Sequence, residues 1–529
     1  MDETPSFSLS AVAAPHVLAA EAGRAILGEG GNAIEAMVAM AATIAVVYPH
    51  MNSIGGDGFW LIGEPRGGVR AIEACGFAGQ GATIDHYRKL AGNAIPARGA
   101  DAALTVPGTI GGWSLALELS ASLGGRIPLS DLLANAVRLA REGYPVSASE
   151  ARTIPLAYES LKDAPGFAEA YLRDGKRLER GELRRANRLA DTLDHLARQG
   201  LDDFYRGDVG REIAADLSRI KAPVTRADLT AYRAAWRDPL SIRLKGATLF
   251  NTPPPTQGLA SLMLLGLFER LDVARLDSFD YFHGLIEATR RALAVRDAIC
   301  TDFDDLEPDW ASVLSPQSLD RKAATISQSK ASPSTRNAAA GDTVWMGAID
   351  ASGRAVSFIQ SSYWEYGSGC VLPTTGVLMG NRGLAFSLDP SSRNRLLPGR
   401  RPFHTLNPPL AFFDDGRVVA YGSMGGDGQP QFQAQVLTRY RDEGKIVAAL
   451  AAPRLLVGRT WGASSATVKL ESGFDEGLAQ ALAKAGHPIE RAEADQADLF
   501  GHAGMLARDP KGAIRAAHDP RSDGGAQGF

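Results

Sequence analysis

The chain has 529 residues, a formal net charge of −4 at pH 7 and a pI near 6.2. Hydrophobic residues make up 45% and charged residues 22%, which is typical of a globular protein. No basic run stands out, so we do not expect nucleic acid as a partner. The three cysteines are too few and too scattered for a disulfide framework or a zinc site, and they favour a reducing compartment.

The N-terminus, Met1–Pro5, is acidic, and no apolar stretch of the signal-peptide kind follows it. The longest apolar run is Ala36–Tyr48, which is shorter than the roughly 20 residues that span a bilayer. The sequence therefore predicts a cytoplasmic protein without a membrane partner.

Helical spacing of apolar residues predicts a first helix over Ala13–Gly28. Asn32 is the expected N-cap of a second helix, Ala33–Val47, which is apolar nearly all round and should therefore be central to the core. The glycine-rich run Gly55–Gly58 precedes an apolar strand, Phe59–Ile62, and we expect its backbone amides to face a cavity. A dinucleotide site is disfavoured because the order of strand, G-x-G-x-x-G and helix is missing.

The middle of the chain predicts helices that cover a core. Ile110–Leu119 and Leu259–Leu271 have helical patterns, and residues 130–237 are helix-rich and more charged, as expected for an outer layer. The acidic cluster Asp302–Asp305 favours a solvated turn over a metal site, because no histidine or further carboxylate lies at ligand spacing.

The last third of the chain alternates strand-like and helical patterns. We expect four strands, over Val356–Ser361, Val377–Met379, Leu410–Phe413 and Val418–Tyr421, and a helix over Gln429–Arg439. This order predicts stacked sheets covered by helices.

A polar, proline-containing stretch from Ser332 to Asp342 runs directly into an apolar strand, Thr343–Asp350. Cleavage between Asp342 and Thr343 would give Thr343 a free α-amine beside its hydroxyl, and thus a base and a nucleophile in one residue. An unperturbed α-amine has a pKa near 8, which suits a base at neutral pH. An ordinary surface loop before a strand is the alternative on local pattern.

Other hydrolytic chemistries find little support in the sequence. No serine has the G-x-S-x-G elbow, H-E-x-x-H is absent, and the nine histidines are scattered. An attacking threonine needs donors for the oxyanion, and Gly425 and Gly426, which follow a predicted strand, could supply unobstructed backbone N–H groups.

Motifs in order along nearly the whole chain resemble the γ-glutamyltransferase family of N-terminal nucleophile hydrolases. They are Ala14–His16, Glu21–Gly23, Gly30–Ala33, Ser53–Phe59, Val106–Thr109, Pro253–Pro255, Arg401–Pro402, Gly422–Gly426 and Asp519–Gly524. The resemblance implies an α/β fold, the four-layer αββα sandwich of N-terminal nucleophile hydrolases. It also implies autocleavage into a large subunit of residues 1–342 and a small subunit of residues 343–529, with no metal or organic cofactor.

The resemblance also assigns roles to single residues. Thr343 matches the nucleophile, Gly425 and Gly426 the oxyanion pair, and Ser361 a threonine that supports the nucleophile. The positions that recognise a γ-glutamyl group differ in this chain. Cys75 stands in place of an arginine, and His404–Thr405 stand in place of two serines. Tyr363 and Ala385 replace an asparagine and an aspartate that bind the α-amine, and Trp345 lies where histidine is common.

These departures favour a smaller amide substrate that carries a carboxylate and no amine. The sequence around Thr343 resembles the oxamate amidohydrolase branch of the family, with Arg382 or His404 as the group that neutralises the carboxylate. Alternatively, Arg382 is a surface residue and His404 packs in the core.

Two further functions stay open, a glutathione hydrolase or γ-glutamyltransferase and an unprocessed relative that binds a ligand without catalysis. A homo-oligomer of the heterodimer is also left open.

Overall fold

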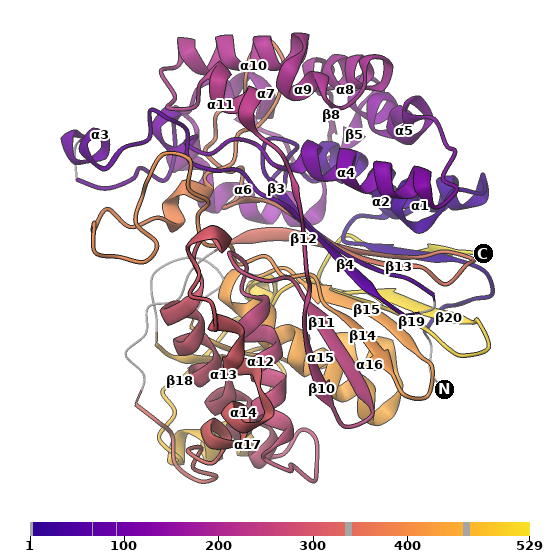
Figure 1. Cartoon of the computed structure of the whole chain (residues 1–529), viewed down its shortest axis with the longest axis vertical. Coiled ribbons are helices and arrows are strands. Elements are labelled where there is room, and N and C mark those ends of the chain that lie inside the picture. The colour runs from indigo at the N-terminus through magenta and orange to yellow at the C-terminus, as the bar shows by residue number, and fades with distance from the viewer. Residues whose placement is uncertain (1–3, 66, 91–92, 334–340, 459–465) are drawn as a thin grey trace.

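Two antiparallel sheets, stacked face to face, form the centre of the molecule (Figure 1). The computed structural model describes residues 4–65, 67–90, 93–333, 341–458 and 466–529. One sheet has the order β1 (Ser6–Phe7), β20 (Ile514–His518), β19 (Ala503–Arg508), β15 (Val418–Ser423), β14 (Leu410–Phe413), β11 (Ala247–Asn251) and β10 (Leu240–Leu244). The other has the order β21 (Gly525–Gly528), β2 (Ala11–Ala14), β12 (Asp342–Ile349), β13 (Ala355–Tyr363), β3 (Asp57–Gly63), β4 (Val69–Ala74) and β9 (Ala235–Arg237).

Helices cover the outer face of each sheet. The sheet that contains β12 is covered by α1 (Val17–Gly28), α2 (Ala33–Val47) and α4 (Thr109–Ser122). Outside them, α5 (Leu129–Glu142) packs on α2 and contacts α8 (Asn187–Gln199). The other sheet is covered by α12 (Gly258–Glu269), α15 (Gln429–Glu443) and α16 (Ile446–Ala451), and α13 (Phe279–Ile299) packs against α12. The four-layer sandwich predicted from the sequence is confirmed, with one apolar core between the sheets and one under each helical layer.

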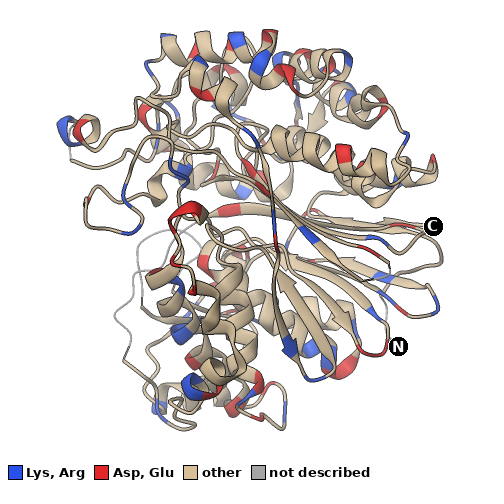
Figure 2. Ribbon diagram, in the orientation of Figure 1, with Lys and Arg blue, Asp and Glu red and all other residues tan. Residues whose placement is uncertain are grey.

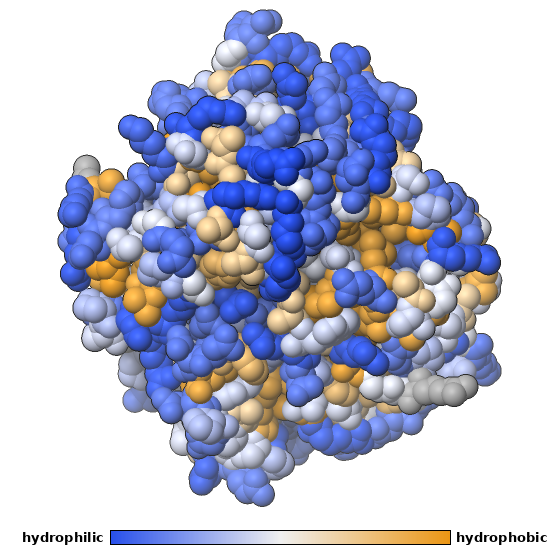
Figure 3. Space-filling view, turned by 45° about the horizontal axis from the view of Figure 1, so that its top comes forward, coloured by the Kyte–Doolittle hydropathy of each residue, from blue (hydrophilic) through white to orange (hydrophobic). Residues whose placement is uncertain are grey.

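Smaller elements surround these layers. The helices are α3 (Ile84–Lys89), α6 (Ala148–Leu161), α7 (Phe167–Tyr171), α9 (Asp203–Arg206), α10 (Asp208–Arg219), α11 (Arg226–Ala231), α14 (Pro316–Ala323) and α17 (Glu476–Lys484). The short strands are the pair β5 (Tyr144–Pro145) and β8 (Leu183–Arg184), the hairpin β6 (Leu172–Arg173) and β7 (Lys176–Arg177), and a small sheet of β16 (Leu455–Val457), β17 (Val468–Leu470) and β18 (Ile489–Arg491). Charges of both signs are interspersed over the outer helices (Figure 2). The face of the molecule seen in Figure 3 is mostly polar, and its apolar residues lie in several separate areas.

Helix α2 has the predicted bounds and position. The Asn32 side chain accepts from the backbone N–H groups of Ile34 and Glu35, and the Glu35 carboxylate accepts from the Asn32 N–H. This reciprocal capping box satisfies donors at the helix start. All residues of α2 are buried, which confirms its central place in the core. In the described ranges, no helix is both long and apolar enough to cross a membrane.

Three local predictions are wrong. The first helix begins at Val17 because Ala11–Ala14 pairs with β12 as a strand. Val377–Met379 forms only isolated bridges inside a long connection. The amides of Gly55 and Gly56 do not face a cavity, because they donate to Ser53 Oγ at 2.9 Å and to the Ser53 carbonyl at 3.2 Å. Glycine is needed at both positions, since a Cβ would lie 2.2 Å or 2.1 Å from the carbonyl oxygen of Leu378 or Ser361, respectively.

The acidic cluster Asp302–Asp305 pairs with basic side chains. Arg400 contacts Asp305 at 2.7 Å, and Arg401 lies 3.8 Å from the buried Asp302. Within the residues that the structure describes, no three histidine, cysteine or acidic side chains are grouped so that they could hold a metal ion.

Candidate active site

Thr343 lies at the start of β12, between the two sheets, and is 1% exposed. The chain is continuous from Asp342 to Thr343, so the site has the geometry of the uncut polypeptide. The Gln429 side chain donates to Thr343 Oγ1 at 3.5 Å, and Gln429 in turn accepts from the Asn407 amide at 3.1 Å. This chain of amides positions the hydroxyl from the first turn of α15.

Ser361, near the end of the neighbouring strand β13, contacts the peptide bond that would be cut. Its hydroxyl donates to the Asp342 carbonyl oxygen at 2.5 Å. The Ser361 hydroxyl oxygen itself accepts from the Tyr363 N–H at 2.8 Å and from Arg382 Nη2 at 3.3 Å. Because two donors occupy the Ser361 oxygen, its own proton is directed at the Asp342 carbonyl, which it polarises.

Arg382, in a short 3₁₀ helix at Arg382–Ala385, is 1% exposed. Its guanidinium lies 4.1 Å from the Tyr363 ring centroid and donates to Thr405 Oγ1 at 3.4 Å. The Nε atom has no hydrogen-bond partner among the described residues. A carboxylate oxygen of Asp57 lies 3.9 Å from this Nε atom. A buried guanidinium with such long contacts is short of acceptors.

Asp57 reaches this guanidinium from the start of β3, and its other oxygen accepts from the Gly76 N–H at 2.9 Å. Burial raises the pKa of Asp57 to about 7, although the positive charge of Arg382 opposes the shift. Near neutral pH, Asp57 is therefore a partly protonated and incomplete counter-ion for Arg382.

His404 is fully buried, with its ring centroid 5.1 Å from that of Phe59. Burial, and then the positive charge of Arg382, lowers its pKa well below the usual value, so the ring is neutral. Neither ring nitrogen has a partner in the described part of the chain. Being neutral, His404 can offer a hydrogen bond but no charge to an anion.

Gly425 and Gly426 form the turn before α15, with φ angles of 124° and 53° that favour glycine. The Gly425 carbonyl accepts from the Gly428 N–H at 2.7 Å, and the Gly426 carbonyl accepts from the Gln257 amide at 2.7 Å. The N–H groups of both glycines make no hydrogen bond to any described residue. Two fixed carbonyls and two available N–H groups are what a pair of oxyanion donors requires.

Gln257 connects this glycine turn to Thr405. Besides the Gly426 carbonyl, its amide nitrogen donates to the Thr405 carbonyl at 2.5 Å. Its oxygen accepts from the buried Arg296, which also pairs with Asp427 at 2.5 Å. Gln257 thus fixes the glycine turn relative to Thr405.

The segment before Thr343 covers the site. A Cβ at Gly341 would lie 3.3 Å from both the Tyr363 ring and Thr405 Oγ1. The Asp342 side chain is buried, and burial, with Glu365 nearby, raises its pKa well above the usual value. Arg98 holds Glu365 in a 3.3 Å ion pair. Residues 334–340 of the predicted loop lie outside the described residues.

Trp345 lies on β12 two residues beyond Thr343, and its ring fills the space between the sheets. Its indole N–H donates to Ser357 Oγ at 2.9 Å. A Cβ at Gly422 or Gly504, on the facing strands, would lie 2.1 Å or 2.3 Å from this ring. The contacts give Trp345 a packing role, and substrate contact by Trp345 stays a prediction.

Replacing Trp345 with phenylalanine tests which role holds. We expect the free energy of unfolding to fall by about 2 kcal/mol, because the smaller ring leaves a void and Ser357 loses its donor. The KM of the processed enzyme should stay unchanged. Denaturant titration and steady-state kinetics measure the two effects, and a large KM change at unaltered stability would favour substrate contact instead.

The structure brings most of the predicted site residues together around Asp342 and Thr343. Ser361, Tyr363, Arg382 and Thr405 form one contact network, and His404 is adjacent to it in the chain. Sequence reasoning missed Gln429, Asn407, Gln257 and Asp57. Asp57 interrupts a glycine run, and an acidic residue in such a run was the available signal.

A family model described as gamma-glutamyltranspeptidase matches residues 19–529. The chain belongs to this family. A Klebsiella pneumoniae relative named oxamate amidohydrolase proenzyme is 49% identical over 519 residues, which cover 98% of both chains. The Bacillus subtilis glutathione hydrolase-like YwrD proenzyme is 37% identical over 526 residues, again 98% of both chains. The solved structure of cephalosporin acylase from Bacillus halodurans has a TM-score of 0.91 at 32% identity and covers 100% of this chain and 97% of its own.

Membership of the gamma-glutamyltranspeptidase family makes the chain an amide hydrolase that acts on C–N bonds. The family consists of autoprocessed N-terminal nucleophile hydrolases, and both sequence relatives carry the word proenzyme in their names.

Proposed function

We propose that the chain cleaves itself between Asp342 and Thr343 and then hydrolyses a small amide whose carboxylate is bonded directly to the amide carbon, as in oxamate. Residues 1–342 and 343–529 become its two subunits, and the cytoplasm is its proposed location. The observation that carries the proposal is the buried Arg382, which is short of acceptors and lies one hydroxyl group from the Asp342 carbonyl.

Self-cleavage begins with attack of the Thr343 hydroxyl on the Asp342 carbonyl carbon. The C–N bond breaks, the nitrogen becomes the free amine of Thr343, and water opens the resulting ester. In turnover the same hydroxyl attacks the substrate amide, and the amine transfers the proton to the departing ammonia. The N–H groups of Gly425 and Gly426 hold the oxyanion, and water releases the acid.

Arg382 supplies the carboxylate contact in this proposal. A carboxylate offers the acceptors that the guanidinium lacks, and such pairs are short, strong and directional. Thr405 and His404 complete the wall around it. Arg382 lies close to the Asp342 carbonyl, because both contact the Ser361 hydroxyl. A substrate whose carboxylate is bonded directly to the amide carbon fits this short separation.

Ammonia release tests the substrate class. Purified, processed protein should release ammonia from oxamate and far less from oxamide, which has the same shape without the carboxylate. Equal rates with both amides would rule out carboxylate recognition. A single band near the 56.0 kDa of the full chain on a denaturing gel would instead favour the non-catalytic binding relative.

A γ-glutamyl substrate is the second candidate, because Asp57 and Arg382 together present opposite charges to an α-amino acid. Hydrolysis of a γ-glutamyl anilide, with or without stimulation by an amino-acid acceptor, would support this alternative. Turnover of oxamate without turnover of the anilide would exclude it.

The pH dependence of KM should show whether the Asp57 carboxylate competes with the substrate for Arg382. Below pH 7 Asp57 is largely neutral and leaves Arg382 to the substrate, whereas above pH 7 its carboxylate competes for the guanidinium. We therefore expect the KM for oxamate to rise several-fold as pH increases through 7. Asp57→Asn should give a lower and flat KM.

Steady-state kinetics at each pH separates this effect from kcat, which follows the Thr343 amine. A wild-type KM that stays constant across pH 7, or an Asn variant with the wild-type slope, would contradict the role of Asp57.

A further inference from the structure

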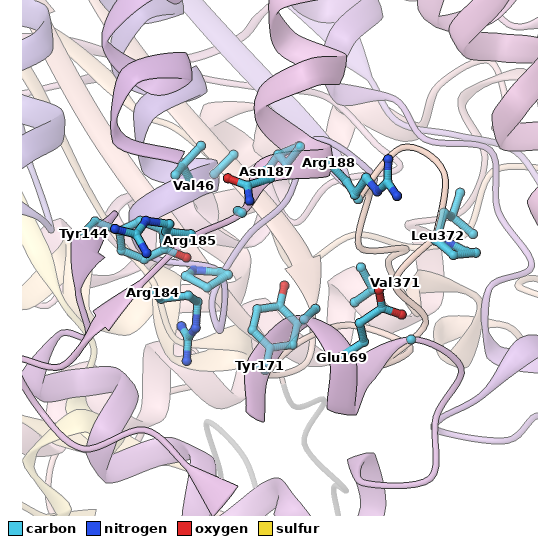
Figure 4. Close-up of a pocket in the computed structure, with 18 residues that line it drawn as sticks. Val46, Tyr144, Glu169, Tyr171, Arg184, Arg185, Asn187, Arg188, Val371 and Leu372 are labelled. Atoms are coloured by element: carbon cyan, nitrogen blue, oxygen red, sulfur yellow. The ribbon is translucent and has the colours of Figure 1, made fainter. Parts of the chain in front are cut away.

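A cavity of about 270 Å³ lies among helices of the large subunit, and none of the site residues described above lines it. Its walls come from the end of α2, from α7, from the start of α8 and from the segment around Val371 and Leu372 (Figure 4). It is thus separate from the Thr343 site.

The N-terminus of α8 opens onto this cavity. The first helical residue is Asn187, and the N-cap residue, Ala186, offers no side-chain cap. The N–H groups of Asn187 and Arg188, in the first turn, have no helical partners. The first turn also contains no acidic residue that could accept from them. The start of a 13-residue helix carries a partial positive charge that favours an anion.

A second and independent observation is the Tyr171 hydroxyl. Tyr171 is 7% exposed, and its ring packs against Phe167 and Tyr366 at centroid distances of 5.1 Å and 4.8 Å. Its hydroxyl points into the middle of the cavity (Figure 4). It makes no hydrogen bond to any described residue. The side chain is thus nearly buried, and its hydroxyl is available as a donor to a ligand in the cavity.

The charges around the cavity are mainly positive. Arg184 is buried in an ion pair with Glu150, whereas Arg185 and Arg188 are exposed at the rim. Glu169, also exposed, is the acidic side chain among the described lining residues. Val46, Val371, Leu372 and neighbouring alanine and proline residues make the remaining wall apolar.

We propose that this cavity binds a small organic carboxylate with an apolar body. The carboxylate accepts from the Tyr171 hydroxyl and from the first turn of α8, and Arg188 adds a positive charge. The apolar body lies against Val46 and Leu372. The ring contact between Tyr171 and Tyr366 connects the occupied cavity to the segment that carries Tyr363, three residues earlier.

Calorimetric titration of the full processed protein tests the proposal with two probes of the same shape. 3-Phenylpropanoate carries the carboxylate, and 3-phenylpropanamide lacks it. We expect saturable binding of the anion alone. Tyr171→Phe should weaken that binding about tenfold, because it removes one hydrogen bond to a charged group.

A second variant separates binding from structure. Asn187→Asp places a negative charge in the first turn of α8, which stabilises the helix but repels an anion. We expect an unchanged or higher thermal midpoint and at least tenfold weaker binding. Tyr158→Phe, which removes a hydroxyl on α6 outside the cavity, is the matched control and should change neither.

Absence of saturable binding, equal binding of both probes, or binding that survives both cavity variants would overturn the proposal. The readout needs no turnover, so the result is independent of the substrate proposed for the Thr343 site.

Discussion

Replacing Thr343 with alanine should leave the protein as one polypeptide of 56.0 kDa with no amidase activity. The variant lacks the hydroxyl that attacks the Asp342 carbonyl, and without cleavage no α-amine forms. Both halves of the catalytic residue are lost together, so we expect turnover to fall at least about 10⁴-fold. A denaturing gel and an ammonia assay measure the two effects.

Thr343→Ser is the matched control, because it keeps the hydroxyl and removes only a methyl group. It should still yield the fragments 1–342 and 343–529, although more slowly. Cleavage of the alanine variant at the same bond would show that Thr343 is not the processing nucleophile.

Replacing Arg382 with glutamine should lower kcat/KM for oxamate by about 10² to 10³-fold. The variant removes the positive charge that we propose binds the substrate carboxylate, and truncating one partner of a buried charge pair costs about 2–5 kcal/mol. Oxamide carries no carboxylate, so its slow hydrolysis should hardly change. Kinetics with both amides on the same preparation gives the ratio.

Arg382 also donates to Ser361, so the glutamine variant should cleave itself more slowly. Rates must therefore be divided by the fraction of cleaved chain on a gel. Arg382→Lys keeps the charge with fewer directed donors and should fall between glutamine and wild type. If the rates with oxamate and oxamide fall in equal proportion, Arg382 does not bind the carboxylate.

Features that depend on local sequence could be predicted. The bounds of α2 follow from the Asn32 cap and an apolar run, and β14 follows from a short apolar segment between turn residues. The strand at Thr343 was expected for the same reason. The glycine pair Gly425 and Gly426 was expected to supply oxyanion donors because it follows a predicted strand. Family resemblance agreed with that expectation and added Ser361.

Features set by long-range contacts could not be predicted. The orientation of Trp345 depends on glycines of two facing strands, Gly422 and Gly504, and Asp57 meets Arg382 only in the folded chain. Val377–Met379 has a strand-like composition, but it lies in a connection whose partners form only isolated bridges. The order of residues in one sequence does not show which distant residues become neighbours in the fold.

The buried Asp342 has a consequence for the direction of processing. Its side chain is 1% exposed, and burial, with Glu365 nearby, raises the pKa of its carboxyl well above the usual value. Cleavage would add a terminal carboxylate to Asp342 and an ammonium to Thr343, and each ion held away from water costs several kcal/mol. Withdrawal of Gly341 and Asp342 into solvent removes that cost, so the cut ends would not rejoin. Processing would then be irreversible. The space that Gly341 and Asp342 leave beside Tyr363 and Thr405 would admit the first substrate.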